Sequence, residues 1–321
     1  MKHIDPHVHC RDWEQSQKAT IKSVCELARK QGIVAIFDMP NTKPPITSEE
    51  LVEKRLELAK KENCLDMYFL YIGATSDPHQ IEECVEVVKS NPKVVGIKMY
   101  AGKSVGDLTI SEEKDQLRVY ERLSKCKYTD VLAVHCEKEN LFKLELFDPD
   151  KPATWNLARP IEAEVESVKD QIKFAKRAGF KGTLHVCHVS APQTVDVIEI
   201  ARNEINITCG VTPHHLLYST SDMKGRKGLM LKVNPPLRDE RTVKLLRTYL
   251  KQEKIDWIES DHAPHTKEDK MLRYSSGIPS LNYYSEFLER LKVWGFTEGQ
   301  IEKLTYKNIK RVFKDKLFQS V

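Results

Sequence analysis

Short apolar runs alternate with longer amphipathic stretches along the whole chain. The runs are rich in β-branched residues and have the length of strands, at 3–5, 33–37, 67–70, 94–97, 131–134, 183–186, 205–208 and 256–259. The stretches between them carry helix signals, with a periodic segment at 23–30, helix starts at Ser48 and Ser111, and a long helix over 162–178 that Gly179 ends. Strands that alternate with helices indicate a parallel sheet.

Eight strand–helix units favour closure into a (β/α)8 (TIM) barrel over an open doubly wound sheet. No GxGxxG motif follows the first strand, which argues against a dinucleotide-binding fold. The length of 321 residues suits one barrel, for which about 250 residues or more is typical. We therefore expect a single barrel domain over 1–321, with C-terminal helices at 297–319 packed on it.

Composition excludes several function classes. Hydrophobic residues make up 40% and charged residues 31% of the chain, and the net charge of +4 is too small to indicate nucleic-acid binding. No apolar run approaches the roughly 20 residues needed to span a bilayer, and the chain opens without a signal peptide. The eight cysteines are scattered and form no CxxC pair. We expect a cytoplasmic protein without disulfides and with neither nucleic-acid nor membrane partners.

Residues that can bind metals terminate several of the predicted strands. They are His7, His9, Lys98, His135, His188 and Asp261. In a barrel, the carboxyl ends of the strands form the catalytic mouth, so these side chains should converge there. An isolated HxH is more often structural than metal-binding, but the joint pattern is specific. Imidazole and carboxylate ligands suit zinc.

Lys98 does not fit a simple metal site, because a free ammonium repels divalent ions. The residues alone leave two alternatives open. Lys98 either points away into a salt bridge, or it reacts with CO2 to form a carbamate whose two oxygens can bridge two metals.

The chain contains further histidines and two long loops outside this set of strand-end residues. His79 and His185 are interpreted as structural, on a helix surface and in the barrel wall, and the roles of His214 and His215 stay open. Loops 101–110 and 211–238 follow predicted strands four and seven at the mouth, where long loops are usually functional. For loop 101–110 the alternatives are a mobile lid and a static connection.

Motifs in this order along nearly the whole chain resemble those of dihydroorotases in the amidohydrolase superfamily. They are DPHVHCRD at 5–12, MPNT at 39–42, GIKMYAG at 96–102, VHCE at 134–137, HVCHVS at 185–190, TPHHL at 212–216, VNPPLR at 233–238 and SDHAPH at 260–265. The resemblance implies reversible hydrolysis of the cyclic amide of (S)-dihydroorotate to N-carbamoyl-L-aspartate, in pyrimidine biosynthesis. It also implies two zinc ions per chain.

The resemblance further implies a role for each site residue. His7, His9 and Asp261 would hold one metal, His135 and His188 the other, and a carboxylated Lys98 would bridge them. Asp261 would also transfer the proton. Substrate contacts would come from His9, Arg11, Asn41, Asn234, His265 and the backbone of Ser276 and Gly277.

The chain departs from many family members in two places. It begins directly at the first strand, so we expect the N-terminal β-sandwich domain of those members to be largely absent. Ser104 stands where members with a mobile catalytic loop often have threonine. The resemblance leaves open a homodimer and an association with aspartate transcarbamoylase.

Two rival functions share parts of this pattern. Hydantoinases and allantoinases have the HxH, lysine and aspartate, but their substrates lack a ring carboxylate. Arg11 and Asn41 therefore favour dihydroorotate. A non-catalytic scaffold barrel is the second rival, and such relatives typically lose ligands that this chain keeps.

Overall fold

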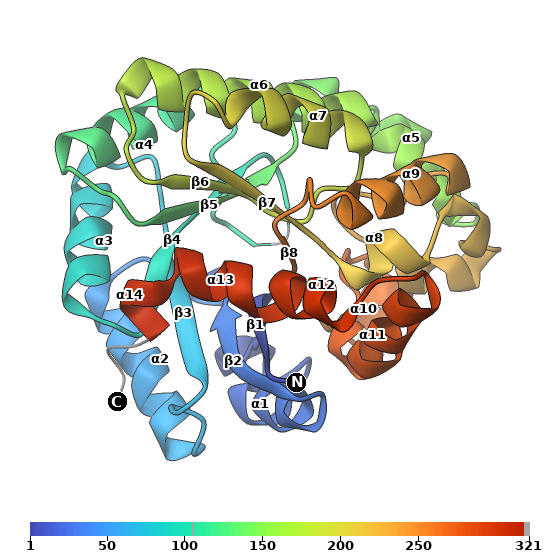
Figure 1. Ribbon diagram of the computed structural model, residues 1–321, viewed down its shortest axis with the longest axis horizontal. Coiled ribbons are helices and arrows are strands. Elements are labelled where there is room, and N and C mark those ends of the chain that lie inside the picture. Colours follow the sequence, from blue (N-terminus) through green and yellow to red (C-terminus); the bar gives the residue numbers. More distant parts are fainter. Residues whose placement is uncertain (105, 318–321) are drawn as a thin grey trace.

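Eight parallel strands form a barrel that helices surround (Figure 1), in a computed structural model that describes residues 1–104 and 106–317. The strands pair in chain order and are β1 (His3–Val8), β2 (Ile33–Asp38), β3 (Tyr68–Gly73), β4 (Val94–Ala101), β5 (Val131–Cys136), β6 (Thr183–Val186), β7 (Ile207–Val211) and β8 (Trp257–Ile258). A parallel bridge between Val8 and His262 closes the ring, and the His9 N–H donates to the His262 carbonyl at 2.9 Å. The predicted (β/α)8 barrel is confirmed.

Helices follow the strands and cover the outside of the barrel. They are α1 (Ile21–Lys30), α2 (Glu49–Lys61), α3 (Pro78–Ser90), α4 (Glu113–Lys125), α5 (Trp155–Ala158), α6 (Ile161–Ala178), α7 (Pro192–Ala201), α8 (Pro213–Leu217), α9 (Glu240–Lys251), α10 (Lys267–Met271), α11 (Tyr284–Val293), α12 (Glu298–Glu302), α13 (Asn308–Val312) and α14 (Lys314–Leu317). Ser48 caps α2 and Gly179 ends α6 with a φ of 66°, as their sequence signals predict.

The helix N-terminus predicted at 111–113 is confirmed, but Ser111 is not the residue that caps it. Helix α4 begins at Glu113, and its N-cap Glu112 makes no side-chain capping bond. The Ser111 hydroxyl instead donates to Glu139 at 2.7 Å, a partner that follows β5 and that no local pattern reveals.

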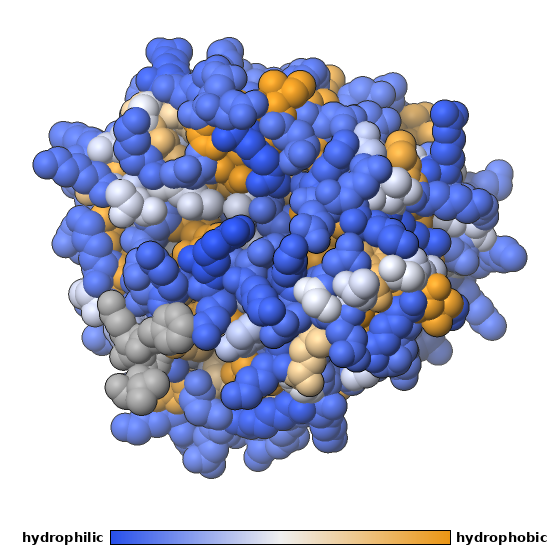
Figure 2. Space-filling view, in the orientation of Figure 1, coloured by the Kyte–Doolittle hydropathy of each residue, from blue (hydrophilic) through white to orange (hydrophobic). Residues whose placement is uncertain are grey.

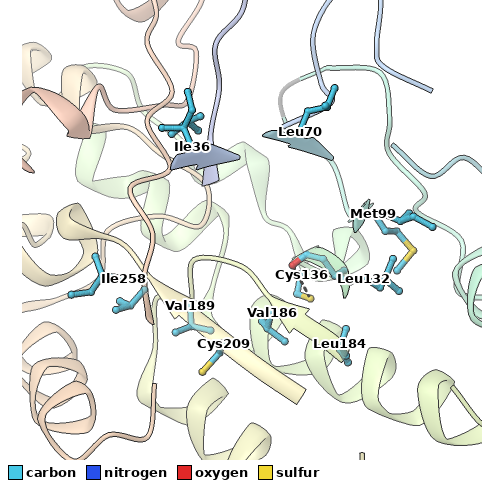
Figure 3. Close-up of a cluster of buried hydrophobic side chains, with 14 of the residues drawn as sticks. Ile36, Leu70, Met99, Leu132, Cys136, Leu184, Val186, Val189, Cys209 and Ile258 are labelled. Carbon is cyan, nitrogen blue, oxygen red and sulfur yellow. Dashed lines mark hydrogen bonds between the residues drawn. The ribbon is translucent and has the colours of Figure 1, made fainter. Parts of the chain in front are cut away.

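Alternation along each strand divides the core into two layers. Residues such as Ile36, Leu70 and Leu132 point away from the barrel axis and pack against the helices (Figure 3). The next residue along a strand points inward, so Phe37 belongs to a separate inner cluster with Tyr71.

The inner cluster is completed by the C-terminal helices, which cross the barrel in Figure 1 (red). Phe313, between α13 and α14, lies with its ring centroid 4.9 Å from that of Phe37, and it also contacts Tyr71 and Trp257. Ile4 and Val95, near the starts of their strands, share this cluster, so the helices close the end opposite the strands' carboxyl ends. Of the expected segment 297–319, residues 318 and 319 lie outside the described residues.

The surface around these helices is mostly hydrophilic, with small scattered apolar patches (Figure 2). Within the described ranges, no helix is both long and apolar enough to cross a bilayer.

The two long loops differ in structure. Loop 211–238 contains α8 and two 3-10 turns, η5 (Thr220–Asp222) and η6 (Arg226–Leu231). In loop 101–110, Gly102 has a φ of 134°, and a Cβ there would lie 1.8 Å from the Glu137 carbonyl oxygen. Only glycine fits this close approach. Val105 of this loop lies outside the described residues.

Candidate metal centre and active site

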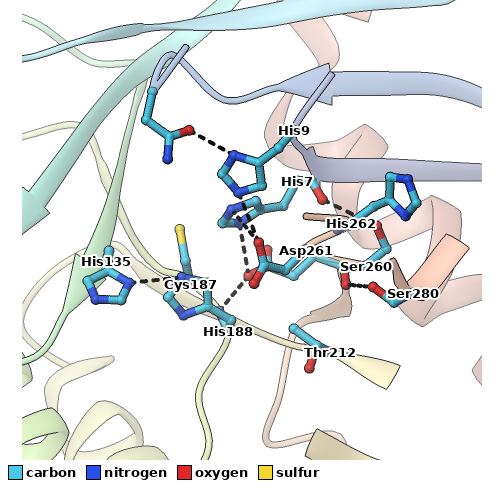
Figure 4. Close-up of polar contacts among 12 residues, drawn as sticks. His7, His9, His135, Cys187, His188, Thr212, Ser260, Asp261, His262 and Ser280 are labelled. Atoms are coloured by element: carbon cyan, nitrogen blue, oxygen red, sulfur yellow. Dashed lines mark hydrogen bonds and ion pairs between the residues drawn. The ribbon is translucent and has the colours of Figure 1, made fainter. Parts of the chain in front are cut away.

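The first group of candidate ligands joins the two ends of the barrel sequence. His7 and His9 point the same way from the end of β1, because strand side chains alternate. Asp261 follows β8, and its Oδ1 lies 3.0 Å from His9 Nε2 and 3.4 Å from His7 Nε2 (Figure 4). The three side chains are buried, and their ligand atoms all lie within 4.8 Å of one another.

The second group comes from β5 and the residues after β6. His135 Nδ1 lies 3.2 Å from His188 Nε2, and both rings are buried (Figure 4). Ligands of a tetrahedral zinc ion, with bonds of about 2.0–2.1 Å, lie about 3.3 Å apart. The separations of 3.4, 3.0 and 3.2 Å are close to that value, so these donor atoms are spaced as the ligands of a metal ion are.

Lys98 lies beneath these groups on β4 and is fully buried. No carboxylate pairs with it among the described residues, and its Nζ lies 2.9 Å from Cys187 Sγ. The salt bridge that the sequence left open as an alternative is therefore absent from that part of the chain. Burial lowers the pKa of both His135 and His188, and the nearby Lys98 charge lowers it further by a smaller amount.

Burial sets the protonation of most ligand histidines. It lowers the pKa of His9 to about 4 and holds that of His188 well below its usual range, which favours the neutral imidazole that binds metals. For His7, burial also lowers the pKa, but hydrogen bonding to Cys187 and Glu259 and the charge of Asp261 raise it to about 10. Burial raises the pKa of Asp261, but His9 and His7 hold it well below its ordinary value.

Two buried carboxylates lie behind the rings of the candidate ligands, and neither was predicted from the sequence. Glu137 Oε2 lies 3.1 Å from His135 Nε2 and pairs with Arg159. Glu259 Oε1 lies 3.6 Å from His7 Nδ1. Each carboxylate directly follows a strand and is two positions from a candidate ligand, and the period of two that aligns His7 with His9 could have flagged them.

One pocket collects ten of the twelve residues that the sequence singled out; Lys98 and His265 do not line it. The lining residues are His7, His9, Arg11, Asn41, Tyr100, Ser104, His135, His188, Val233, Asn234, Asp261, Ala263, Ser276 and Gly277. Tyr100, Val233 and Ala263 lie within the quoted motifs, but they carry no metal-binding or charged group and no role was predicted for them.

Arg11 places a guanidinium in the wall of this pocket. Its side chain is 1% exposed, and among the described residues its Nε and Nη1 have no hydrogen-bond partner. Its Nη2 lies 3.3 Å from His265 Nε2. Buried donors of this kind are unfavourable unless a ligand satisfies them.

Other predicted substrate-binding residues, Asn41, Asn234 and Ser276, line the same pocket, and each makes a further contact. The Oδ1 of Asn41 lies 2.7 Å from His9 Nδ1, which fixes the ring of a candidate ligand. Trp155 Nε1 donates to the Asn234 side chain at 3.1 Å, and the Lys232 ammonium donates to Ser276 Oγ at 2.9 Å.

The remaining histidines lie outside the pocket. His79 is on the surface of α3, and His185 is buried against Glu259 at 2.9 Å. His215 lies between Thr212 Oγ1 at 2.8 Å and the Pro235 carbonyl at 3.0 Å, which connects α8 to the end of loop 211–238. His214 is fully buried, and both its ring nitrogens lack a partner among the described residues.

The backbone is strained at three site residues. Arg11, His188 and Asp261 have φ values of 61°, 40° and 44°, in the left-handed region that side-chain-bearing residues rarely adopt. Such strain persists only where surrounding contacts impose it, and it is concentrated at functional sites.

Comparison with known proteins gives relatives along most of the chain. A dihydroorotase from Methanosphaera stadtmanae is 30% identical, over 97% of this chain and 70% of its own length. One from Thermococcus kodakarensis is 36% identical, over 87% of this chain and 59% of its own length. No protein-family model matches the chain. The chain thus spans 70% of the length of the first relative and 59% of the length of the second.

Solved structures share the fold. An L-hydantoinase (dihydropyrimidinase) from Arthrobacter aurescens matches with a TM-score of 0.86 at 24% identity, over 97% of this chain and 70% of that one. A dihydroorotase from Campylobacter jejuni matches with a TM-score of 0.75 at 20% identity, over 98% of this chain and 83% of that one. The sequence identity to these curated relatives shows that the chain belongs to the dihydroorotase family.

Proposed function

We propose that this protein is a zinc-dependent dihydroorotase that interconverts dihydroorotate and N-carbamoyl-aspartate. The observation that carries the proposal is Arg11, a buried guanidinium with unpartnered donors in the pocket that also holds both ligand groups. A dihydroorotate ring carries a carboxylate that such a fork can bind through two parallel hydrogen bonds. The sequence relatives named dihydroorotase support the same reaction.

The pocket walls would orient the substrate. The pocket encloses about 370 Å³, part of which is open to solvent. With its carboxylate on Arg11, the ring would place its amide groups toward Asn234 and the backbone of Ser276 and Gly277, and its scissile carbonyl toward the ligand groups. Holding the reacting groups in one geometry supplies a large part of the rate enhancement of such enzymes.

The two ligand groups and a carboxylated Lys98 would hold two zinc ions, whose chemistry when bound would be to polarise the ring carbonyl and to ease deprotonation of a water. The Asp261 carboxylate, kept ionised by His9 and His7, would accept the proton of that water. It would then return the proton to the ring nitrogen as the carbon–nitrogen bond breaks. Ring closure would follow the same steps in reverse, with Asp261 protonated at the start.

The buried position of Lys98 supports its carboxylation. Carbamate formation needs a neutral amine, joins its nitrogen to the carbon of CO2 and releases one proton. The Lys98 side chain is buried, with its Nζ 2.9 Å from Cys187 Sγ, and no carboxylate among the described residues pairs with it.

Direct assay tests the proposal. Purified protein with its metal should hydrolyse dihydroorotate far faster than hydantoin or allantoin, because only the first carries a ring carboxylate for Arg11. A preference for hydantoin or allantoin would favour the rival hydrolase function, and activity toward none of the three would favour a scaffold.

We also propose that the protein acts in the cytosol, which its free cysteines support. A homodimer and an association with aspartate transcarbamoylase stay predictions.

A further inference from the structure

Glu259 occupies a central position under the candidate metal centre. It directly follows β8, two residues before Asp261, and is 1% exposed. Its Oε2 accepts from Trp257 Nε1 at 3.1 Å and lies 2.9 Å from His185 Nε2. Its Oε1 accepts from the backbone N–H of His188 at 2.5 Å and lies 3.6 Å from His7 Nδ1.

The fold makes room for this carboxylate. A Cβ on Gly210, in the neighbouring strand β7, would lie 2.5 Å from the Glu259 carboxyl carbon. Glycine at this position therefore allows the carboxylate to lie against β7 and to reach toward both β1 and the residues after β6.

The contact with His7 fixes which ring nitrogen can bind a metal. His7 Nε2 lies 3.4 Å from Asp261 Oδ1, and His7 Nδ1 lies 3.6 Å from Glu259 Oε1, with Cys187 close to both His7 and Glu259. A carboxylate beside Nδ1 favours the tautomer that carries its proton there, which leaves the Nε2 lone pair for the metal.

The contact with His188 holds the second ligand group. His188 has a φ of 40°, and the hydrogen bond from its N–H to Glu259 helps to maintain this strained backbone. One carboxylate thus reaches a ligand of each group, although the two ligands come from strands far apart in the barrel order.

We propose that Glu259 is a positioning residue that couples the two halves of the metal centre, so that its loss weakens metal binding at both. The inference rests on the proposed binuclear site. Glu259 is close to His7 and Cys187, and these three could themselves hold an ion. Because both Glu259 oxygens already accept hydrogen bonds from other groups, we favour the positioning role.

Zinc affinity measured by competition with a chromophoric chelator tests the inference on the purified full-length chain. Glu259→Gln keeps the size of the side chain and removes its charge, and both zinc ions should bind about 10- to 100-fold more weakly. Glu259→Asp should recover part of the affinity. Excess zinc should restore turnover of Glu259→Gln, which a merely structural defect would not allow.

Glu164→Gln is a matched control. Glu164 is equally buried and accepts hydrogen bonds from Ser190 and Thr194, near His188, but no ring of a candidate ligand contacts it. This variant should lower the melting temperature and leave zinc affinity unchanged. If Glu259→Gln does not fold, Gly210→Ala displaces the carboxylate without removing it and should also weaken zinc binding.

The outcomes separate this inference from the proposed function. A wild-type protein that binds no zinc would refute the binuclear site itself. Two tight zinc ions in both the wild type and Glu259→Gln would overturn the positioning role alone. Three ions in the wild type and two in Glu259→Gln would make Glu259 a direct ligand, which also overturns it.

Discussion

Replacing Arg11 with methionine tests the substrate assignment most directly. Methionine keeps an unbranched side chain in the left-handed backbone of Arg11, which has a φ of 61°. The substitution removes a guanidinium that is 1% exposed and whose Nε and Nη1 find no partner among the described residues. In the complex, those donors would face the dihydroorotate carboxylate.

The expected loss follows from this burial. Truncating one partner of a desolvated, hydrogen-bonded charge pair costs about 2–5 kcal/mol, which corresponds to roughly 30-fold to several-thousand-fold in affinity. The protein without substrate should not lose stability, because the variant removes buried donors that nothing satisfies. A large loss of kcat/KM should therefore accompany an unchanged or higher melting temperature.

The assay compares kcat/KM for dihydroorotate and for hydantoin, which lacks the carboxylate. The loss should appear with dihydroorotate and be small with hydantoin. Arg29→Met serves as a control, because Arg29 is largely exposed and pairs with Asp66 on the surface. Equal losses for both substrates would refute the assignment and make Arg11 a structural residue.

Further predictions concern the metals, the proton and the loop. Lys98→Ala should lose metal content and activity together in elemental analysis and assay, and short carboxylic acids in solution should restore part of both; full activity would exclude a bridging role. Because the pKa of His7 is raised to about 10 without metal, zinc binding should displace a proton, so its affinity should rise as pH increases from 6 to 8 in chelator titrations; a flat profile would contradict this. Asp261→Asn should abolish both directions of the reaction while substrate still binds, and in the wild type hydrolysis should rise and ring closure fall with increasing pH; parallel profiles would remove Asp261 from proton transfer. Deleting residues 103–106 should cut turnover and leave metal content unchanged if the loop acts as a lid, whereas unchanged turnover would show a static connection.

The chain alone determined the architecture and most of the pocket. Successive strand residues such as Ile36 and Phe37 alternate between the outer and inner layers of the core, and this alternation depends only on local strand geometry. The strand-end positions of His7 and His135 followed in the same way, because all parallel strands of a barrel end at one mouth. The sequence therefore predicts which side chains reach the mouth of the barrel, because this depends on residue type and on the two-residue repeat of a strand.

Only the tertiary structure decided the contacts between segments distant in the chain. Phe313 closes the inner cluster, Cys187 meets Lys98, and Glu259 reaches both His7 and His188. None of these pairings has a local signal, since each depends on which strands become neighbours and how closely their side chains approach.

The strained backbone of Arg11 and Asp261 has the same origin. Neither residue type prefers these torsions strongly enough to reveal them, and packing and hydrogen bonding from other strands impose them. The sequence determines which groups arrive at the mouth of the barrel, and the packing of distant strands decides how they are held, because burial and strain are properties of the folded whole.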